Sequence, residues 1–215
     1  MTQRGKFITV EGQDGAGKTT NLAFVRRRLE QAGIAVIETR EPGGTALGEM
    51  LREVVLHRKE LGISPLAELL LIFAARAQHL EEKIEPALAA GAWVLCDRFT
   101  DATYAYQGGG RGLSGSRIAT LEKLVQGTLR PDLTLLLDVD VGTGAKRAGE
   151  RSGADRFESE NHRFKEAVRA QYLERARQEP DRIKVVDASR SLEAVQHSIG
   201  GVLDGFLRET GKIKP

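Results

Sequence analysis

The sequence of 215 residues is poor in the features of cross-linked or membrane-embedded proteins. Its one cysteine, Cys96, excludes an internal disulfide and any metal site built from several cysteines. No apolar stretch reaches the roughly 18 residues of a membrane-spanning helix, and the apolar run near the N-terminus is too short for a signal peptide. We therefore expect a cytoplasmic protein without a membrane partner.

A surplus of charge of one sign is also lacking. The 32 basic and 30 acidic residues leave a net charge of +2, so no basic surface for nucleic acid is predicted. Hydrophobic residues make up 40% and charged residues 29% of the chain, which argues against global disorder. Because there is no internal repeat and no linker, we expect one domain over residues 1–215.

Short apolar runs alternate with longer amphipathic segments along the chain. The runs lack polar alternation, which is typical of strands covered on both faces. Helical spacing between them predicts an α/β fold, a parallel sheet flanked by helices. One such helix begins at Ser64-Pro65, and Pro86 is expected to kink or end it. The expected strands are Phe7–Val10, Ala35–Ile37, Trp93–Cys96, Leu133–Leu137 and Ile183–Val186.

Residues 12–19, GQDGAGKT, fit the phosphate-binding pattern GxxxxGK[ST] at every position. They follow the apolar run FITVE and open an amphipathic segment, and a phosphate-binding loop requires both a preceding strand and a following helix. A glycine turn that matches the pattern by chance requires neither of them. Lys18 is expected to reach the β- and γ-phosphates of ATP or GTP, and the Thr19 hydroxyl to ligate Mg²⁺. The predicted nucleotide-binding residues are Gly12, Gln13, Asp14, Gly15, Ala16, Gly17, Lys18, Thr19 and Thr20.

Two further segments indicate an acceptor that carries a phosphate. Asp97 and Arg98 follow the third apolar run, where an aspartate can hold Mg²⁺ and an arginine can clamp a phosphate. Phe73 and Arg76 stand three residues apart on one predicted helix. A ring beside a guanidinium suits the base and phosphate of a nucleoside monophosphate, although simple core packing explains Phe73 equally well.

Five segments in order, EGQDGAGKTT, TREPGGT, LLIFAARAQHL, LCDRFTDATYAYQGGGRG and DRFESE, resemble those of bacterial thymidylate kinases. The resemblance implies transfer of the γ-phosphoryl group of ATP to dTMP with Mg²⁺, giving dTDP and ADP on the way to dTTP. It also implies a homodimer and the P-loop nucleotide-kinase fold, a five-stranded parallel sheet in the order 2-3-1-4-5 with a short lid.

The resemblance also assigns roles to individual residues. Asp14 would position the acceptor phosphate, Arg98 would bridge the donor and acceptor phosphates, and Asp97 would lie near the metal with Thr19. Phe73 would stack on thymine and Tyr106 would crowd the 2′ position of the sugar. Many relatives carry the phenylalanine four residues before the arginine, where Ile72 stands here. The dTMP-binding residues so implied are Glu41, Pro42, Phe73, Arg76, Arg98, Thr103, Tyr106, Gln107, Phe157 and Glu158.

The phosphate-binding loop has no arginine, because Gly15 and Ala16 follow Asp14. Some thymidylate kinases carry one there. We expect residues 142–158 to form a lid that supplies this charge, with Arg151 as first choice and Arg147 as second. The predicted catalytic set is Lys18, Arg98, Asp14, Arg151 and Arg147.

Alternatives remain at this point. Another nucleoside monophosphate kinase or a deoxynucleoside kinase would share most of these motifs, and a nucleotide-hydrolysing switch would share the phosphate loop. A switch needs a base-specificity motif such as NKxD, which the sequence lacks. The glycine-rich residues 107–112 are expected to form a surface turn. The histidines lack metal-ligand spacing and are expected on surfaces or helix faces: His57, His79, His162 and His197.

Overall fold

The five apolar runs form the strands of one parallel sheet, in the order β2-β3-β1-β4-β5 that the family resemblance implies. The structure is a computed structural model and describes residues 3–149 and 155–213. The strands are β1 (Phe7–Glu11), β2 (Val36–Arg40), β3 (Trp93–Asp97), β4 (Leu133–Asp138) and β5 (Ile183–Asp187).

Strand β1 lies between β3 and β4, with Val10 paired to Asp97 on one side and to Leu135 on the other. All these pairings are parallel, so the carboxyl ends of β1 and β3 reach the same edge of the sheet. The phosphate-binding loop after β1 and the Asp97-Arg98 turn after β3 therefore lie side by side, at the edge where open α/β sheets bind ligands.

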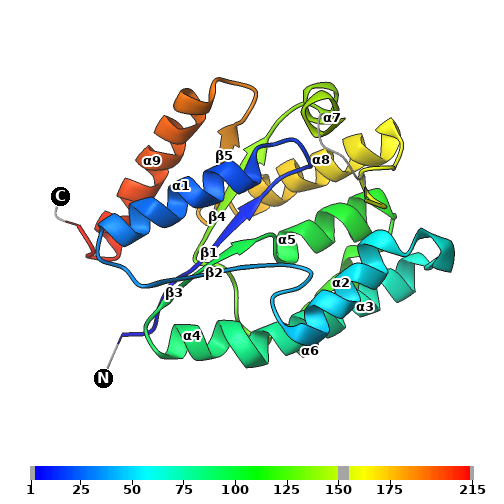
Figure 1. The fold of residues 1–215 in the computed structure, drawn as a ribbon, viewed down its shortest axis with the longest axis horizontal. Coiled ribbons are helices and arrows are strands. Elements are labelled where there is room, and N and C mark those ends of the chain that lie inside the picture. The colour runs from blue at the N-terminus through cyan, green and yellow to red at the C-terminus, as the bar shows by residue number, and fades with distance from the viewer. Residues whose placement is uncertain (1–2, 150–154, 214–215) are drawn as a thin grey trace.

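Helices cover both faces of the sheet (Figure 1). Helices α1 and α9 pack together over one face, where Ile8 and Val10 of β1 point. Phe7 alternates to the opposite face and packs among α4, β3 and the segment before α4. The helices are α1 (Lys18–Gln31), α2 (Ala46–His57), α3 (Pro65–His79), α4 (Glu85–Ala89), α5 (Thr100–Thr103), α6 (Gly115–Gln126), α7 (Val141–Gly149), α8 (His162–Gln178) and α9 (Leu192–Glu209).

The helix expected to kink or end at Pro86 changes its geometry earlier in the chain. Helix α3 ends at His79 and passes into a π-helical segment, Leu80–Ile84, before α4 begins. Pro86 lies in the first turn of α4. At this position the N–H group that proline lacks is not needed for the hydrogen bonds within the helix.

Two strands are less covered than their apolar character predicts. Ile37 of β2 is 38% exposed and Val185 of β5 is 49% exposed. Both strands lie at the edges of the sheet, and their exposed positions are not covered by the helices of either layer. The expectation that every strand is covered on both faces is therefore wrong for β2 and β5.

The glycine-rich segment is packed rather than exposed, so the expectation of a surface turn is wrong. Residues Tyr104–Gly110 form a π-helical segment that lies against α8. A Cβ atom at Gly109 would stand 2.6 Å from the carbonyl oxygen of Ala167, a backbone atom that cannot yield. The glycines thus allow this segment to approach α8 closely, and this approach fixes the position of the neighbouring Tyr106 and Gln107.

Candidate active site

The phosphate-binding loop connects β1 to α1 and has the open conformation that its glycines permit, with positive φ angles at Gly12, Gly15 and Gly17. The Lys18 ammonium folds across it and donates hydrogen bonds of 3.0 Å to the carbonyl oxygens of Gly12 and Gln13. Burial and the nearby Arg98 charge lower the pKa of Lys18. The ammonium is thus held directly at the loop, while Thr19 and Thr20 are exposed on the first turn of α1.

Arg98 stands over this loop in a strained conformation. Its φ angle is +65°, a region that residues with side chains rarely adopt, and its N–H donates to Val10 at 3.0 Å. The guanidinium pairs with the Asp14 carboxylate at 2.6 Å and also donates to the Tyr106 hydroxyl at 3.2 Å. Burial alone would raise the pKa of Asp14, but Arg98 and Lys18 together lower it to about 2. The site therefore holds a fixed carboxylate between two cations.

A cavity opens beside this ion pair, between the sheet edge and α3. It brings together every sequence-predicted acceptor residue except Phe73 and Glu158. Its lining residues are Asp14, Glu41, Pro42, Ile72, Arg76, Arg98, Phe99, Ala102, Thr103, Tyr106, Gln107, Asp155 and Phe157.

Arg76 forms the buried end of this cavity and is only 1% exposed. Its Nε donates to Glu41 at 2.7 Å and its Nη2 to the Thr103 hydroxyl at 2.9 Å. The guanidinium carbon lies 4.8 Å from the centres of both the Phe73 and Phe99 rings. Arg76 is therefore oriented by hydrogen bonds at its edge and by aromatic rings near it.

The structure does not bring Phe73 to the cavity. Glu68, Ile72 and Arg76 are spaced by four residues and share one face of α3, and the last two line the cavity. Phe73 lies about 100° further around the helix and packs with Leu69 and Ile118 in the core. The sequence interpretation chose the aromatic residue, whereas the geometry places Ile72 at the cavity wall.

The last residues of the predicted lid segment, Phe157 and Glu158, lie on the other side of the site. The Phe157 ring meets the Tyr106 ring edge-on at 5.2 Å between centroids. Glu158 lines an adjoining hollow with Gln13 and Asp14, and burial together with the Asp14 charge raises the pKa of Glu158. Arg156 donates to the carbonyl of Val55 and pairs with Glu68. Arg156 therefore ties this segment to α2 and α3.

Glu68 is a site residue that sequence reasoning missed. It is fully buried and accepts hydrogen bonds from Gln107 at 2.7 Å and from Arg111, besides its pairing with Arg156. Its spacing could have indicated this position, because Glu68 stands two helical turns before Arg76 on the same face of α3. A carboxylate on that face predicts basic partners, which are Arg111 and Arg156.

The residues predicted to hold a metal ion fit that role. Asp97 and Thr19 line one polar groove beside the phosphate loop, where Arg40 pairs with Glu49 at 2.8 Å. The Asp97 Oδ1 atom and the Arg98 Nε atom are both buried without a hydrogen-bond partner within the described part of the chain. The described residues contain no cluster of three or more acidic, histidine or cysteine ligands. This donor set suits Mg²⁺, which takes one or two protein oxygens and completes its shell with water and substrate phosphates.

Of the two predicted lid arginines, the structure describes only Arg147. Arg147 of α7 donates to the carbonyl oxygens of Ala188 at 2.7 Å and Ser189 at 3.3 Å, so its side chain is held at the loop after β5 and not at the phosphate loop. Arg151 lies outside the described residues. Helix α7 packs so closely on the phosphate loop that a Cβ atom at Gly15 would overlap the Gly144 carbonyl, which explains why no side chain follows Asp14.

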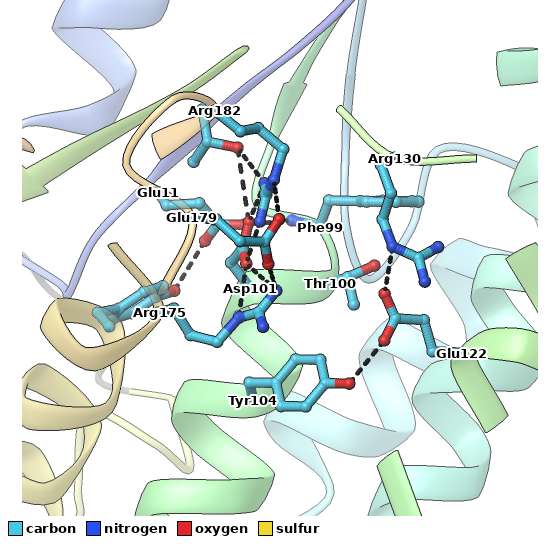
Figure 2. Close-up of polar contacts among 12 residues, drawn as sticks. Glu11, Phe99, Thr100, Asp101, Tyr104, Glu122, Arg130, Arg175, Glu179 and Arg182 are labelled. Carbon is cyan, nitrogen blue, oxygen red and sulfur yellow. Dashed lines mark hydrogen bonds and ion pairs between the residues drawn. The ribbon is translucent and has the colours of Figure 1, made fainter. Parts of the chain in front are cut away.

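A buried polar network stands behind the Arg98 turn, and most of it was not predicted (Figure 2). Glu11 is fully buried and accepts hydrogen bonds from the Phe99 N–H at 2.7 Å and the Tyr172 hydroxyl at 2.8 Å. Asp101 is held by Arg182 at 2.7 Å and by Arg175 at 3.1 Å. The network fixes both ends of the segment that follows Arg98.

One histidine also departs from expectation. His79 is completely buried, whereas the other three are exposed as predicted. Asp138, the last residue of β4, pairs with Arg169 of α8 at 2.7 Å.

Glu11 gives the site a pH-dependent stability. Burial and the nearby Asp101 charge raise the pKa of Glu11 from 4.5 to about 8. Because the folded pKa lies above the unfolded one, the stabilising contribution is complete below about pH 4.5 and is lost as the pH rises toward 8.

We therefore expect Glu11→Gln to gain stability relative to the parent by at least about 1 kcal/mol between about pH 5 and pH 8.5. Urea unfolding at the two pH values measures this difference. Glu193→Gln, at an exposed carboxylate of α9, is the control for removal of one negative charge. An equal response of Glu11→Gln and Glu193→Gln would show that Glu11 titrates normally.

Known proteins share this fold and these motifs over nearly the whole chain. A thymidylate kinase from Pseudomonas putida is 58% identical over 203 residues, which cover 94% of this chain and 97% of the relative. One from Hahella chejuensis is 57% identical over 197 residues, covering 92% and 95%. A solved thymidylate kinase from Ehrlichia chaffeensis superposes with a TM-score of 0.76 at 34% identity, covering 94% of this chain and 99% of that one.

The family model described as thymidylate kinase matches residues 10–199. Within the described residues, no helix is long and apolar enough to cross a lipid bilayer. The phosphate loop, the Arg98 turn and the Arg76 cavity thus occur together in a chain similar throughout to these enzymes. The chain belongs to the thymidylate kinase family, whose members are ATP-dependent kinases that phosphorylate dTMP.

Proposed function

We propose that the phosphate loop holds ATP, that the Arg76 cavity holds dTMP, and that the reaction occurs at the Asp14–Arg98 pair between them. The supporting observation is that Asp14 belongs to the loop and Arg98 contacts it, yet both line the cavity. The product dTDP is one phosphorylation short of dTTP. We assign the enzyme to the cytoplasm, where ATP and dTMP are both present.

Catalysis in this arrangement is mainly electrostatic. Phosphoryl transfer passes through a loose transition state whose charge spreads over the equatorial oxygens, and fixed cations stabilise it. Lys18 faces the donor phosphates, while Arg98 bridges donor and acceptor, its unpartnered Nε supplying a ready donor. Asp14 holds the Arg98 guanidinium in place. We propose that Thr19 and Asp97 hold Mg²⁺, which would neutralise charge on the β- and γ-phosphate oxygens.

In the acceptor site, Arg76 and Thr103 supply donors for the phosphate and the base edge of dTMP, and Gln107, Glu41 and Pro42 complete that wall. Tyr106 closes the sugar side, where its ring crowds the 2′ position. Phe157 and Glu158 approach from the lid side. Ile72, in place of Phe73, provides the apolar wall for thymine.

A pair of substitutions on α3 separates these two residues. Ile72→Ala should raise the KM for dTMP roughly tenfold, because it removes apolar contact with the base. Phe73→Leu keeps the core filled and should leave that KM within about threefold. Steady-state kinetics with saturating ATP measures both, and thermal melts check the fold. The reverse pattern would restore Phe73 as the base platform.

We further propose that the chain is a single kinase domain in which residues 142–158 act as a lid. The first part of this stretch is α7, which already contacts the phosphate loop through Gly144. Because the loop has no arginine of its own, the transferred group needs a cation from outside it. Arg151 is our first candidate, and Arg147 is second because it is held at the loop after β5.

Arg151→Ala should therefore lower kcat at saturating ATP and dTMP by at least about 100-fold, a lower bound set below the roughly 10³- to 10⁵-fold effect of supplied arginines. Arg147→Ala is the matched control and should retain kcat within a few-fold. Circular dichroism confirms that both variants fold. If neither variant loses more than a few-fold, the lid supplies no catalytic cation and Arg98 must carry that charge alone.

We also propose a homodimer formed through α2, α3 and α6. These helices pack against one another and lie together in Figure 1. They expose several large apolar side chains, which favours burial against a second copy. These side chains are Leu47, Met50, Leu66, Leu70 and Leu124.

Leu124 is 78% exposed on α6, so Leu124→Glu should shift the protein toward the monomer. Sedimentation velocity over a concentration series measures the shift. Leu192→Glu introduces the same charge at an exposed leucine of α9 and should leave the dimer intact. A parent protein that sediments as a monomer at all concentrations would contradict the proposal.

A further inference from the structure

The buried histidine on α3 has no role in the mechanism above, yet it contacts the acceptor site through one intermediate. His79 is completely buried, and Glu41 beside it is 4% exposed. The Nδ1 atom of His79 lies 3.0 Å from Glu41 Oε1, and Nε2 lies 2.7 Å from the Thr39 hydroxyl. Glu41 Oε2 in turn accepts the 2.7 Å hydrogen bond from Arg76 Nε.

The chemistry of these partners fixes the direction of each hydrogen bond. The Glu41 carboxylate is paired with the Arg76 guanidinium and accepts hydrogen bonds, so the N–H group at this contact is on His79 Nδ1. The Thr39 hydroxyl can then donate to the Nε2 lone pair. Each Glu41 carboxylate oxygen thereby has its own donor, His79 on one side and Arg76 on the other, and the carboxylate plane is fixed.

The surrounding chain seals this arrangement from solvent. The loop after β2 passes directly over the imidazole, and a Cβ atom at Gly44 would stand 2.7 Å from the Thr39 Oγ1 and closer still to the His79 ring. No larger residue fits between the loop and His79. The loop that carries Glu41 and Pro42 into the acceptor cavity is therefore seated on the Thr39–His79 pair.

We propose that His79 is a positioning residue for the dTMP site, which holds Glu41 in the rotamer that aims the Arg76 guanidinium at the acceptor. His79 does not touch the substrate; it acts through Glu41. This inference rests on the proposed assignment of Arg76 to the dTMP site. It predicts that loss of the hydrogen bond between Nδ1 and Glu41 raises the KM for dTMP. Loss of the hydrogen bond between Nε2 and Thr39 should leave that KM nearly unchanged.

Two isosteric substitutions separate the two nitrogens. The amide nitrogen of asparagine is bonded to Cγ, as Nδ1 is in histidine, so His79→Asn keeps a donor for Glu41. The polar atoms of glutamine are bonded to Cδ, at the distance of Nε2, so His79→Gln keeps the contact with Thr39 and loses the one with Glu41. Both variants replace the ring with an amide, and asparagine, which is one methylene smaller, loses more packing than glutamine. Packing loss alone would therefore harm His79→Asn more, the opposite of what the inference predicts.

We expect His79→Gln to raise the KM for dTMP about tenfold, while the KM for ATP stays within about twofold. His79→Asn should keep the KM for dTMP within about threefold of the parent. Thermal melts of both variants report the loss of packing separately. Equal values of the dTMP KM in the two folded variants, or a higher value in His79→Asn, would overturn the inference, because a purely structural histidine does not predict a higher value in His79→Gln.

Arg76→Lys distinguishes failure of this inference from failure of the site assignment. Lysine keeps the charge but loses the planar fork, so the KM for dTMP should rise if Arg76 contacts the acceptor. An unchanged KM in Arg76→Lys would overturn the assignment of the site itself, and the inference with it. A raised KM in Arg76→Lys with equal His79 variants would overturn only the role of His79.

A measurement on the unaltered protein keeps the inference testable if both histidine variants fail to fold. Long-range ¹⁵N–¹H spectra of histidine-labelled protein distinguish a proton on Nδ1 from one on Nε2. His79 can be recognised because the other three histidines are exposed. The proton is expected on Nδ1 in the free protein and in the dTMP complex. A neutral ring protonated on Nε2 would leave Glu41 without its donor and overturn the inference.

Discussion

The turn after β3 is the constraint on which the active site depends. Arg98 has a left-handed backbone that is unfavourable for a residue with a side chain, and two bonds from β1 hold it there. The Arg98 N–H donates a hydrogen bond to the Val10 carbonyl, and the Phe99 N–H donates one to the buried Glu11 carboxyl group. Because β1 also leads into the phosphate loop, the same strand sets the position of both the phosphate loop and Arg98.

Helix α8 supports this turn from behind. Its Tyr172 hydroxyl donates a hydrogen bond to Glu11. Its Arg175 donates to Asp101, three residues after Arg98, as Figure 2 shows. The helix follows residues 142–158, the proposed lid segment, in the chain, and the glycine-rich segment that contains Tyr106 packs against it. A displacement of α8 would therefore disturb the contacts of Glu11, Asp101 and Tyr106 together, so the proposed lid segment leads into a helix that also braces the Arg98 turn.

Features encoded by a short stretch of chain could be predicted from the sequence: the strands, the phosphate loop, and the position of Asp97 and Arg98 at the end of a strand. Features that depend on partners distant in sequence could not. Apolar patterning on α3 does not separate Ile72 from Phe73, because one faces the cavity and the other faces α6, and both are buried. His79 was misplaced for the same reason, since Thr39 and Glu41 come from another part of the chain.

Cys96 is the one thiol of the chain, and it lies beneath the catalytic turn. It is fully buried in β3, donates toward the Arg98 carbonyl at 3.0 Å, and has its pKa raised well above the usual range by burial and by the nearby Glu41 carboxylate. A thiol in this state is shielded from alkylating reagents and is a poor nucleophile. A cysteine introduced on the surface of α7 or α2 would therefore be the only reactive one, and a fluorophore attached there could report movement of that helix without removal of the native residue.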